Sequence, residues 1–313
     1  MHAGAAHADN YEYGCCISLW NYALHLKMEK ETLLSYDTAF TARAIVQLYV
    51  NIMFRYINNP NPFDNGPPQF DDILKTAHYI SSGIDTALQL LKLQPTCQSQ
   101  LDIFDIVLNT WIHLIHILLQ LAETEAQLSQ IFMQVMPMLQ KEVRTHRAGD
   151  SLLHLAVSSS STLHSNSFLD GDGSSRPHNV FPSFEVTDFI LKCGYDVHVQ
   201  NNLNETPLHI AVKAENFMTD VTKVLLDKGA HLDVPDLRDI TPLDILKAHN
   251  QTKVQIMPYI SLKCLAAQVI MRERVPYGPE DVPEDLRHML EMHAPHLPAI
   301  SALALKELYD MEA

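Results

Sequence analysis

The chain has 313 residues, of which 47% are hydrophobic and 19% are charged, a balance typical of a folded protein rather than a disordered one. Its formal net charge of −15 argues against binding to nucleic acid or to an anionic membrane, because phosphate contacts need a basic stripe. Five scattered cysteines without a CxxC pair indicate a reducing compartment, so we expect a cytoplasmic protein, with the nucleus as a second location.

Neither the first residues of the chain nor its longest apolar stretch predicts a signal peptide or a membrane-spanning segment. Residues 1–10 lack a cationic region followed by an apolar run, so we expect a disordered lead there and no signal peptide. The longest apolar stretch, Trp111 to Ala122, is too short to span a bilayer and contains three polar side chains, His113, His116 and Gln120.

Residues 11–147 are predicted to form antiparallel helices. The segments Leu19–Leu26 and Ala39–Val46 carry the small/aromatic alternation found in helix pairs like those of tetratricopeptide repeats, although no regular 34-residue period is visible. Asn58 to Pro68 holds four prolines and predicts a loop. With glycine scarce and alanine and leucine common, the predicted fold class is all-α, a helical solenoid followed by other repeats.

A long apolar helix is predicted to begin near Ser99 and to be buried on most sides. His113 and His116 lie on it at i, i+3, a spacing at which a metal site is conceivable. No third ligand is near them in the sequence. We therefore expect both to be core histidines with polar tips.

Three ankyrin repeats are predicted over residues 148–257. Thr206 to Ala211 reads T-P-L-H-I-A, which matches the ankyrin signature, and Thr241 opens another copy 35 positions later. A degenerate copy begins at Ser151, and the extra length before the next copy is assigned to an inserted loop over 158–183.

The ankyrin pattern also assigns roles to individual residues. Threonine is expected to cap the first helix of each repeat, proline to occupy its first turn, and histidine to bond to the adjoining turn. His154 and His209 are therefore expected to be structural rather than metal-binding or catalytic.

Two short apolar-faced helices are predicted near the C-terminus. On the first, the apolar positions fall at i, i+3, i+4, i+7 and i+8 and comprise Leu262, Leu265, Ala266, Val269 and Ile270. On the second, Pro283 can begin the helix, and Val282, Leu286 and Leu290 repeat every fourth residue. Spacing alone leaves two roles open, capping of the repeat array or docking on another protein.

Motifs for chemistry are missing from the sequence. It contains no GxGxxG, no GxxxxGK[ST], no HExxH, no G-x-S-x-G and no metal-spaced Cys/His quartet. Asp170 to Gly173 resembles the start of a calcium loop, but the remaining ligands and the closing glutamate are missing, so a flexible linker is expected. We predict a binding protein without catalytic, cofactor or metal residues; an enzyme would have to combine His113, His116 and a distant acid.

The C-terminal segment, residues 258–313, resembles a VHL box. Residues 261–270 are similar to its elongin-C-binding helix, the BC box, in which Ser261, Leu262 and Ile270 match and Ala266 replaces the usual cysteine. Residues 282–290 are similar to a cullin-2 box, an apolar residue and a proline followed by two apolar positions at four-residue steps.

The whole arrangement resembles the C-terminal half of the Fem (feminization) family, including Cys15 to Trp20 near the start and Leu-Lys-Cys-Leu-Ala-Ala from Leu262. That resemblance implies a non-catalytic substrate receptor of a cullin-2 RING ubiquitin ligase. Its implied partners are elongin C, held with elongin B, cullin-2 and substrate proteins. Leu262 would enter a pocket of elongin C, and Leu265, Ala266, Val269 and Ile270 would line the contact between the two proteins. Cullin-2 would contact Val282, Pro283, Leu286 and Leu290.

One departure from the family pattern shapes the expectation. Fem proteins begin with a long run of ankyrin repeats that carries most of the degron pocket, and this sequence has no such run. We therefore expect a short isoform, a divergent paralogue or an incomplete gene model. Such a chain is expected to recognise few or no degrons. The alternative function is an ankyrin/helical scaffold outside the ubiquitin system, in which the two terminal helices cap the stack.

Overall fold

The computed structural model describes residues 13–30, 32–58, 69–93, 98–161, 163, 180–249, 254–273, 275–278 and 281–293. These residues form helices and no β-strand, apart from an isolated bridge between Arg144 and Ser151, which confirms the all-α prediction. The predicted lead over 1–10, most of the predicted loop after Asn58 and the segment Asp170–Gly173 lie outside the described residues.

The chain divides into two compact units, residues 1–196 and 197–313. This boundary falls inside the predicted ankyrin segment 148–257. The reason is that the first predicted repeat packs on the long helices: α7 (Leu152–Ala156) and α8 (Phe184–Lys192) both contact α5 (Gln98–Leu121).

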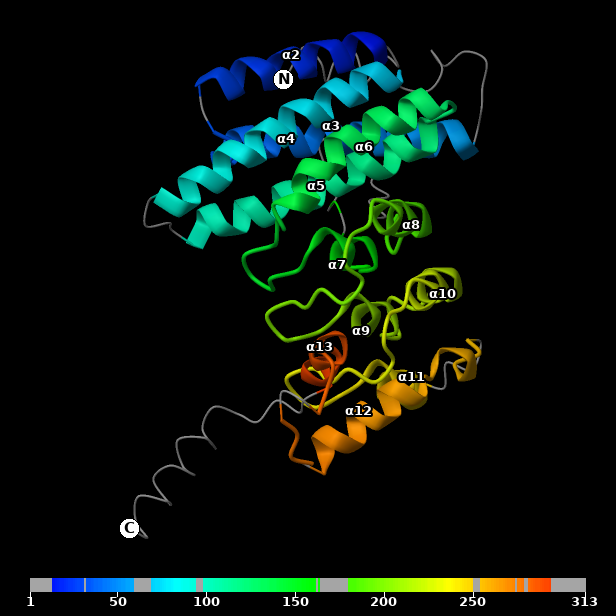
Figure 1. The fold of residues 1–313 in the computed structure, drawn as a ribbon. Coiled ribbons are helices and arrows are strands. Elements are labelled where there is room, and N and C mark those ends of the chain that lie inside the picture. Colours follow the sequence, from blue (N-terminus) through cyan, green and yellow to red (C-terminus); the bar gives the residue numbers. More distant parts are fainter. Residues whose placement is uncertain are drawn as a thin grey trace. The chain divides into compact units, whose positions relative to one another are not determined.

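The first unit is built around α5. Besides α7 and α8, α5 packs against three other long helices (Figure 1) and buries 14 of its 24 residues. The long helices are α2 (Tyr13–Lys30), α3 (Tyr36–Asn58), α4 (Phe70–Leu93), α5 and α6 (Glu125–Gln140). Of these, α3, α4 and α6 contact α5, so the broad apolar face of α5 has a neighbour on most sides, as its sequence predicts.

The length of α5 corrects one prediction. The helix spans 24 residues, so the expectation that its apolar stretch is too short to cross a bilayer was wrong. Within the described residues it is the one helix long and apolar enough for a span, but 72% of its apolar window is buried inside the protein. That burial is typical of a core helix.

A network of side-chain hydrogen bonds joins α2, α3 and α4. Thr76 donates a hydrogen bond to Asn21 Oδ1 (2.6 Å), and its hydroxyl lies 3.1 Å from the Tyr49 hydroxyl. Asn21 in turn donates to Tyr49 (3.3 Å). Tyr49 and Thr76 are fully buried, so the three side chains satisfy one another where water cannot.

Helix α4 also approaches its neighbours closely at Gly83. A Cβ atom placed there would lie 2.3 Å from Leu33 Cδ1 and 2.8 Å from Met28 Cε. Leu33 is 1% exposed and has little room to move. The absence of a side chain at Gly83 therefore permits this contact.

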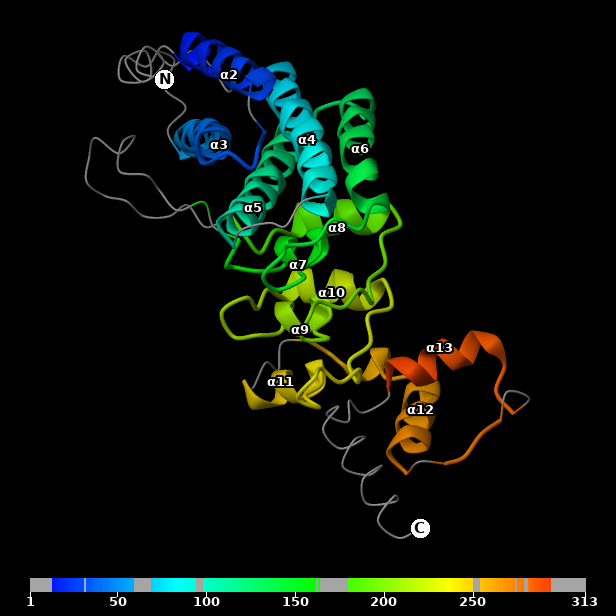
Figure 2. The ribbon, with the colours of Figure 1, turned by 90° about the vertical axis from the view of Figure 1, so that its left-hand side faces the viewer.

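The second unit contains five helices and a 3₁₀ turn in its described residues. They are α9 (Pro207–Ala211), α10 (Thr219–Asp227), α11 (Pro242–Ala248), the turn η1 (Met257–Tyr259), α12 (Leu262–Arg272) and α13 (Glu284–Met292). Figure 2 labels the helices of this unit, α9 to α13. Helix α9 packs against α10 and α11, and α12 packs against α13.

The ankyrin signature works as the sequence predicts. Thr206 caps α9 through a capping box with His209, and Pro207 occupies the first turn. The backbone N–H of Thr206 donates to His209 Nδ1 (2.9 Å), so the ring proton sits on Nε2 and is donated to the Ile240 carbonyl (3.2 Å). Burial lowers the pKa of His209 to about 4, which keeps the ring neutral.

A glycine turn ends α10. The N–H groups of Gly229 and Ala230 donate to the carbonyls of Leu226 and Leu225, the paired bonds of a Schellman motif. Gly229 has φ = 93°, a conformation that other residues rarely adopt. The turn leads directly into His231, so the position of that side chain is set by the end of α10.

Candidate functional site

Helix α12 presents an apolar ridge to solvent. Leu262 is 85% exposed, Val269 57% and Leu265 44%, and Ala266 is also exposed. Ile270, at the edge of this face, is half-buried. Because these residues follow i, i+3, i+4 and i+7, the helix places them on one side.

The opposite face of α12 is buried. It is formed by Cys264 and Ala267, which are 5% and 2% exposed. Ser261 caps the helix by accepting a hydrogen bond from the backbone N–H of Cys264 (3.0 Å), and its hydroxyl lies 2.9 Å from Cys264 Sγ. The cap makes Leu262 the first helical residue, so its side chain leaves the helix where no preceding turn covers it.

Helix α13 has a more buried apolar face. Pro283, at its N-cap, is exposed, and Val282 and Leu286 are half-buried. Leu290 is only 4% exposed. The predicted cullin-2 set is therefore split: its first three members offer surface at the start of α13, and Leu290 supports the helix from inside.

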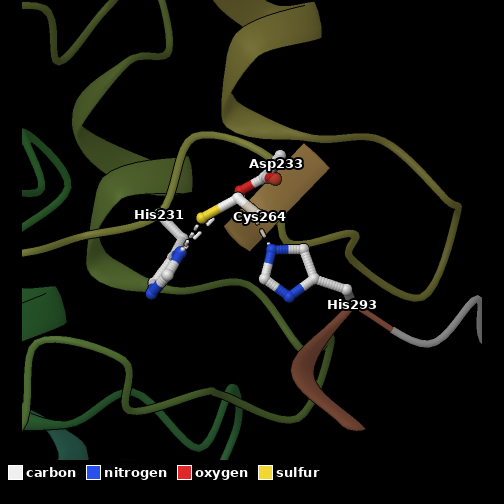
Figure 3. A group of neighbouring side chains, drawn as sticks. All are labelled: His231, Asp233, Cys264 and His293. Carbon is white, nitrogen blue, oxygen red and sulfur yellow. Dashed lines mark hydrogen bonds and ion pairs between the residues drawn. The ribbon is translucent and has the colours of Figure 1, made fainter. Parts of the chain in front are cut away.

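Four polar side chains meet beside α12 (Figure 3). His231, Asp233, Cys264 and His293 each offer a ligand atom, and these atoms lie within 4.8 Å of one another. His231 Nδ1 is 3.0 Å from Cys264 Sγ and 3.8 Å from Asp233 Oδ1, and His293 Nε2 is 3.0 Å from Asp233 Oδ1. In the described part of the chain, this is the one group of such residues that could hold a metal ion.

Burial and neighbouring charges shift the titration of this cluster. Burial, aided by His198 and His293, lowers the pKa of His231 to about 4, so the ring is neutral near pH 7. Burial also raises the pKa of the Cys264 thiol. Burial alone would lower the pKa of His293, but Asp233 and the Met289 carbonyl favour the protonated ring and raise it.

Sequence reasoning missed this cluster. His231 and Asp233 are two positions apart in the chain, but Cys264, on α12, follows Asp233 by 31 residues, and His293, at the end of α13, follows Cys264 by another 29. That spacing matches no short metal motif. The available signal was a histidine and an aspartate directly after an ankyrin-repeat ending, which by itself is common.

The histidines that the sequence did single out have structural partners. His113 and His116 are buried in α5; His113 Nδ1 donates to the Asn109 carbonyl (2.7 Å), and His116 Nδ1 lies 3.0 Å from the Ser183 hydroxyl. Burial lowers the pKa of His113 to about 4. His154 completes the capping box of Ser151 at the start of α7.

The first unit also contains an open cavity of about 540 Å³. Its charged lining mixes both signs: Arg43, Arg147, Asp102, Asp105 and Asp150. Asp105 accepts hydrogen bonds from the backbone N–H groups of His146 and Arg147, so its carboxylate holds the turn after α6. Opposite charges side by side give this cavity no marked preference for anions or cations.

Comparison with known proteins identifies relatives for nearly the whole chain. Residues 203–237 match the ankyrin repeat family. The chain is 29% identical to protein fem-1 homolog A from Bos taurus over 295 residues, 28% identical to fem-1 homolog C from Homo sapiens and 29% identical to fem-1 homolog C from Xenopus laevis over 296. Each match covers 93% of this chain but only 42–44% of the relative.

The chain thus spans less than half the length of the curated relatives it matches. The residue-level resemblance to the Fem family, drawn from the sequence, and these relatives agree. The chain contains an ankyrin repeat and is similar to Fem-1 proteins over nearly all of its length.

Proposed function

We propose that the protein is a substrate-recognition or adaptor subunit of a cullin-2 RING ubiquitin ligase and acts in ubiquitin-dependent protein degradation. The observation that carries the proposal is the exposed ridge of α12, in which Leu262, the leucine that a BC box requires, is 85% exposed. The resemblance of residues 261–270 to that motif and the kinship with Fem-1 proteins support it.

The first step of the proposed mechanism is docking of α12 in an apolar groove of elongin C. Leu262 would fill a pocket, and Leu265, Ala266, Val269 and Ile270 would line the contact. Burying a large apolar side chain contributes about 1.5–3 kcal/mol, so Leu262 would be an energetic hot spot. The opposite face of α12 would stay against its own unit through Cys264 and Ala267.

Cullin-2 would be contacted at the start of α13. There Pro283 is exposed and Val282 and Leu286 are partly exposed, whereas Leu290 is buried. We therefore assign the first three residues to direct contact and give Leu290 the role of holding the helix in place.

The receptor itself would do no chemistry. By holding a substrate near a ubiquitin-loaded enzyme on the cullin arm, it would raise the local concentration of the substrate's lysine side chains. This role belongs to the cytoplasm or nucleus and needs no cofactor. The net charge of −15 is compatible with protein partners and disfavours nucleic acid.

The test is co-purification of the tagged chain with elongin B, elongin C and cullin-2, comparing wild type with Leu262→Asp. Asp at the first helical position interacts favourably with the helix dipole, and Leu262 makes little contact with its own unit. The variant should therefore keep its melting temperature and lose elongin C. Met257→Asp, at a residue that is 77% exposed on η1, is the matched control and should keep elongin C.

Two results would reject the proposal. One is undiminished elongin C binding by Leu262→Asp. The other, which favours the scaffold alternative, is no elongin in the wild-type preparation together with a lower melting temperature for Leu262→Asp.

The cullin contact is tested separately. The double variant Val282→Ala/Pro283→Ala should retain elongin B and C and lose cullin-2, because it changes the start of α13 and leaves the α12 ridge intact. Retention of cullin-2 would remove this contact from the proposal. A degron-peptide panel run on the wild-type complex would then show whether this chain recognises substrates by itself.

A further inference from the structure

The cluster of His231, Asp233, Cys264 and His293 has the dimensions of a tetrahedral metal site. Zinc binds nitrogen, oxygen and sulfur ligands at about 2.0–2.3 Å, which places the ligand atoms about 3.3–3.8 Å apart. The measured separations are 3.0, 3.0 and 3.8 Å, and no pair exceeds 4.8 Å. Side-chain shifts of a few tenths of an ångström would complete the geometry for most of these pairs.

The surroundings of His293 favour a positive charge at its Nε2. Its Nδ1 lies 2.7 Å from the Met289 carbonyl, which can only accept, so Nδ1 carries a proton. Its Nε2 then faces Asp233 Oδ1 at 3.0 Å. That nitrogen is buried and makes no well-directed hydrogen bond. A ring nitrogen and a carboxylate oxygen this close need a positive charge between them, which either a proton on Nε2 or a bound metal ion supplies.

The cluster also has the second layer of contacts that fixes metal ligands. A ligating histidine usually donates its other ring N–H to a carbonyl or carboxylate, as His293 does to Met289. The Ser261 hydroxyl lies 2.9 Å from Cys264 Sγ, and Gln268 Nε2 donates to the Asp233 carbonyl (3.4 Å). These contacts orient the sulfur atom and the turn that carries the carboxylate.

The ligand types select the metal. One thiol, two imidazoles and one carboxylate suit Zn²⁺ rather than Mg²⁺ or Ca²⁺, which prefer oxygen ligands. Binding would release to solvent the thiol proton of Cys264 and the Nε2 proton of those His293 rings that are protonated. Zn²⁺ with one thiolate, one carboxylate and two neutral imidazoles has no net charge, so its burial carries no charge penalty.

From this geometry we infer that His231, Asp233, Cys264 and His293 bind one structural zinc ion. The ion joins three segments: the turn after α10, the first turn of α12 and the end of α13. Four protein ligands leave no open position for substrate, so the site is structural rather than catalytic. It would fix the rotation of α12 about its axis. The inference does not depend on the proposed ligase function, because zinc is measured without any partner.

The experiment uses the full chain without a polyhistidine tag. Metal analysis of the purified protein should find one zinc ion per chain. Replacement of zinc by Co²⁺ should give intense visible bands of a tetrahedral site and a near-ultraviolet thiolate-to-cobalt band. Cys264→Ser should lose the thiolate band and bind zinc at least tenfold more weakly.

Matched variants separate binding from folding. Cys193→Ser removes the other cysteine whose side chain is described, and His249→Gln removes an exposed histidine of the same unit; both should keep zinc and the cobalt spectrum. Cys264→His keeps a ligand, so it should retain metal but lose the thiolate band. Circular dichroism of each variant checks that it is folded.

Metal removal provides a second readout. Lys263 and Arg272 are exposed trypsin sites on α12, and a chelator should speed cleavage there in wild type and leave the rate in Cys264→Ser unchanged. Folded wild type without stoichiometric zinc, or a thiolate band that persists in Cys264→Ser, would overturn the inference.

Discussion

Helices α5 and α12 are both rich in apolar residues, yet they have opposite environments. Helix α5 buries 14 of its 24 residues against neighbouring helices of its unit. Helix α12 buries two of its eleven, Cys264 and Ala267, and leaves leucines and a valine exposed. An apolar pattern therefore shows that a surface needs covering, and the neighbouring helices decide whether the protein covers it by itself.

The same contrast separates the histidines of the two helical regions. His113 and His116 are three positions apart in the sequence. Each lies within hydrogen-bond distance of a residue of the first unit, the Asn109 carbonyl and the Ser183 hydroxyl respectively. His231 and His293 are 62 residues apart in the chain and lie with their ring centroids 5.4 Å apart. Proximity in the folded chain, rather than in the sequence, makes the candidate site.

The largest expected difference in stability is between two variants that each truncate one leucine, in α5 and in α12. Leu114→Ala in α5 should lower the free energy of unfolding by about 2–5 kcal/mol, because it leaves a cavity in a close-packed core. Leu262→Ala in α12 should change it by less than about 0.5 kcal/mol, as expected for an exposed side chain. Urea titration followed by circular dichroism measures both. Equal losses would show that α12 is covered by its own unit.

A second substitution tests how tightly the first unit is packed. Gly83→Ala should destabilise the protein by about 1–2 kcal/mol, because overpacking against Leu33 and Met28 outweighs the gain of about 0.5–1 kcal/mol in helix propensity. Ser82→Ala, at an exposed position beside it, should have little effect. Thermal unfolding compares the two variants. A stabilised Gly83→Ala protein would mean that Leu33 can move aside.

Helix capping gives a third comparison. Thr206→Ala breaks a reciprocal, buried capping box with His209 and should cost about 1–2 kcal/mol. Ser261→Ala removes a one-way cap from α12 and should cost about 0.5–1 kcal/mol in metal-free protein. Chemical denaturation in the presence of a chelator measures both. The reverse order would mean that α12 contributes more to stability than its burial indicates.

The smallest effect is a pH dependence in the turn before α11. Burial alone would raise the pKa of Asp236, but hydrogen bonds from the Ile240 N–H and from Arg238 lower it below 3.8. The carboxylate therefore stabilises the fold fully above the unfolded pKa, and this contribution is lost as pH falls through the folded value.

Asp236→Asn should accordingly flatten the acid end of the stability curve while leaving its slope near neutrality unchanged. Asp220→Asn, at an exposed position on α10, is the control and should keep the wild-type curve. Unfolding free energies of the two variants and of wild type, measured from pH 3 to pH 7, give the acid slopes to be compared. A wild-type acid slope in Asp236→Asn would remove this carboxylate from the account.

Local signals in the sequence were enough to predict the repeats and the terminal helices. The capped T-P-L-H start at Thr206 and the face from Leu262 to Ile270 depend on residues within one or two turns, so they can be recognised without tertiary contacts. The Fem family resemblance rested on the same short patterns.

The rest depends on long-range packing. The exposure of Leu262 and the burial of Leu290 follow from which helices pack together, and apolar spacing is the same in both cases. The four-residue cluster joins His231 to His293 through two turns and two helices. The packing of α7 and α8 on α5, which places the unit boundary after residue 196, is likewise absent from local sequence.

The opposed faces of α12 constrain its length. Each residue turns an α-helix by about 100°, so inserting or deleting one residue between Cys264 and Val269 would rotate the outer leucines and valine away from a common face. After such a change, the residues on the two sides of the altered position could no longer place Cys264 in the buried face and Leu262, Leu265 and Val269 together on the exposed face. Evolution can therefore exchange side chains along α12 far more readily than it can change the number of residues in it.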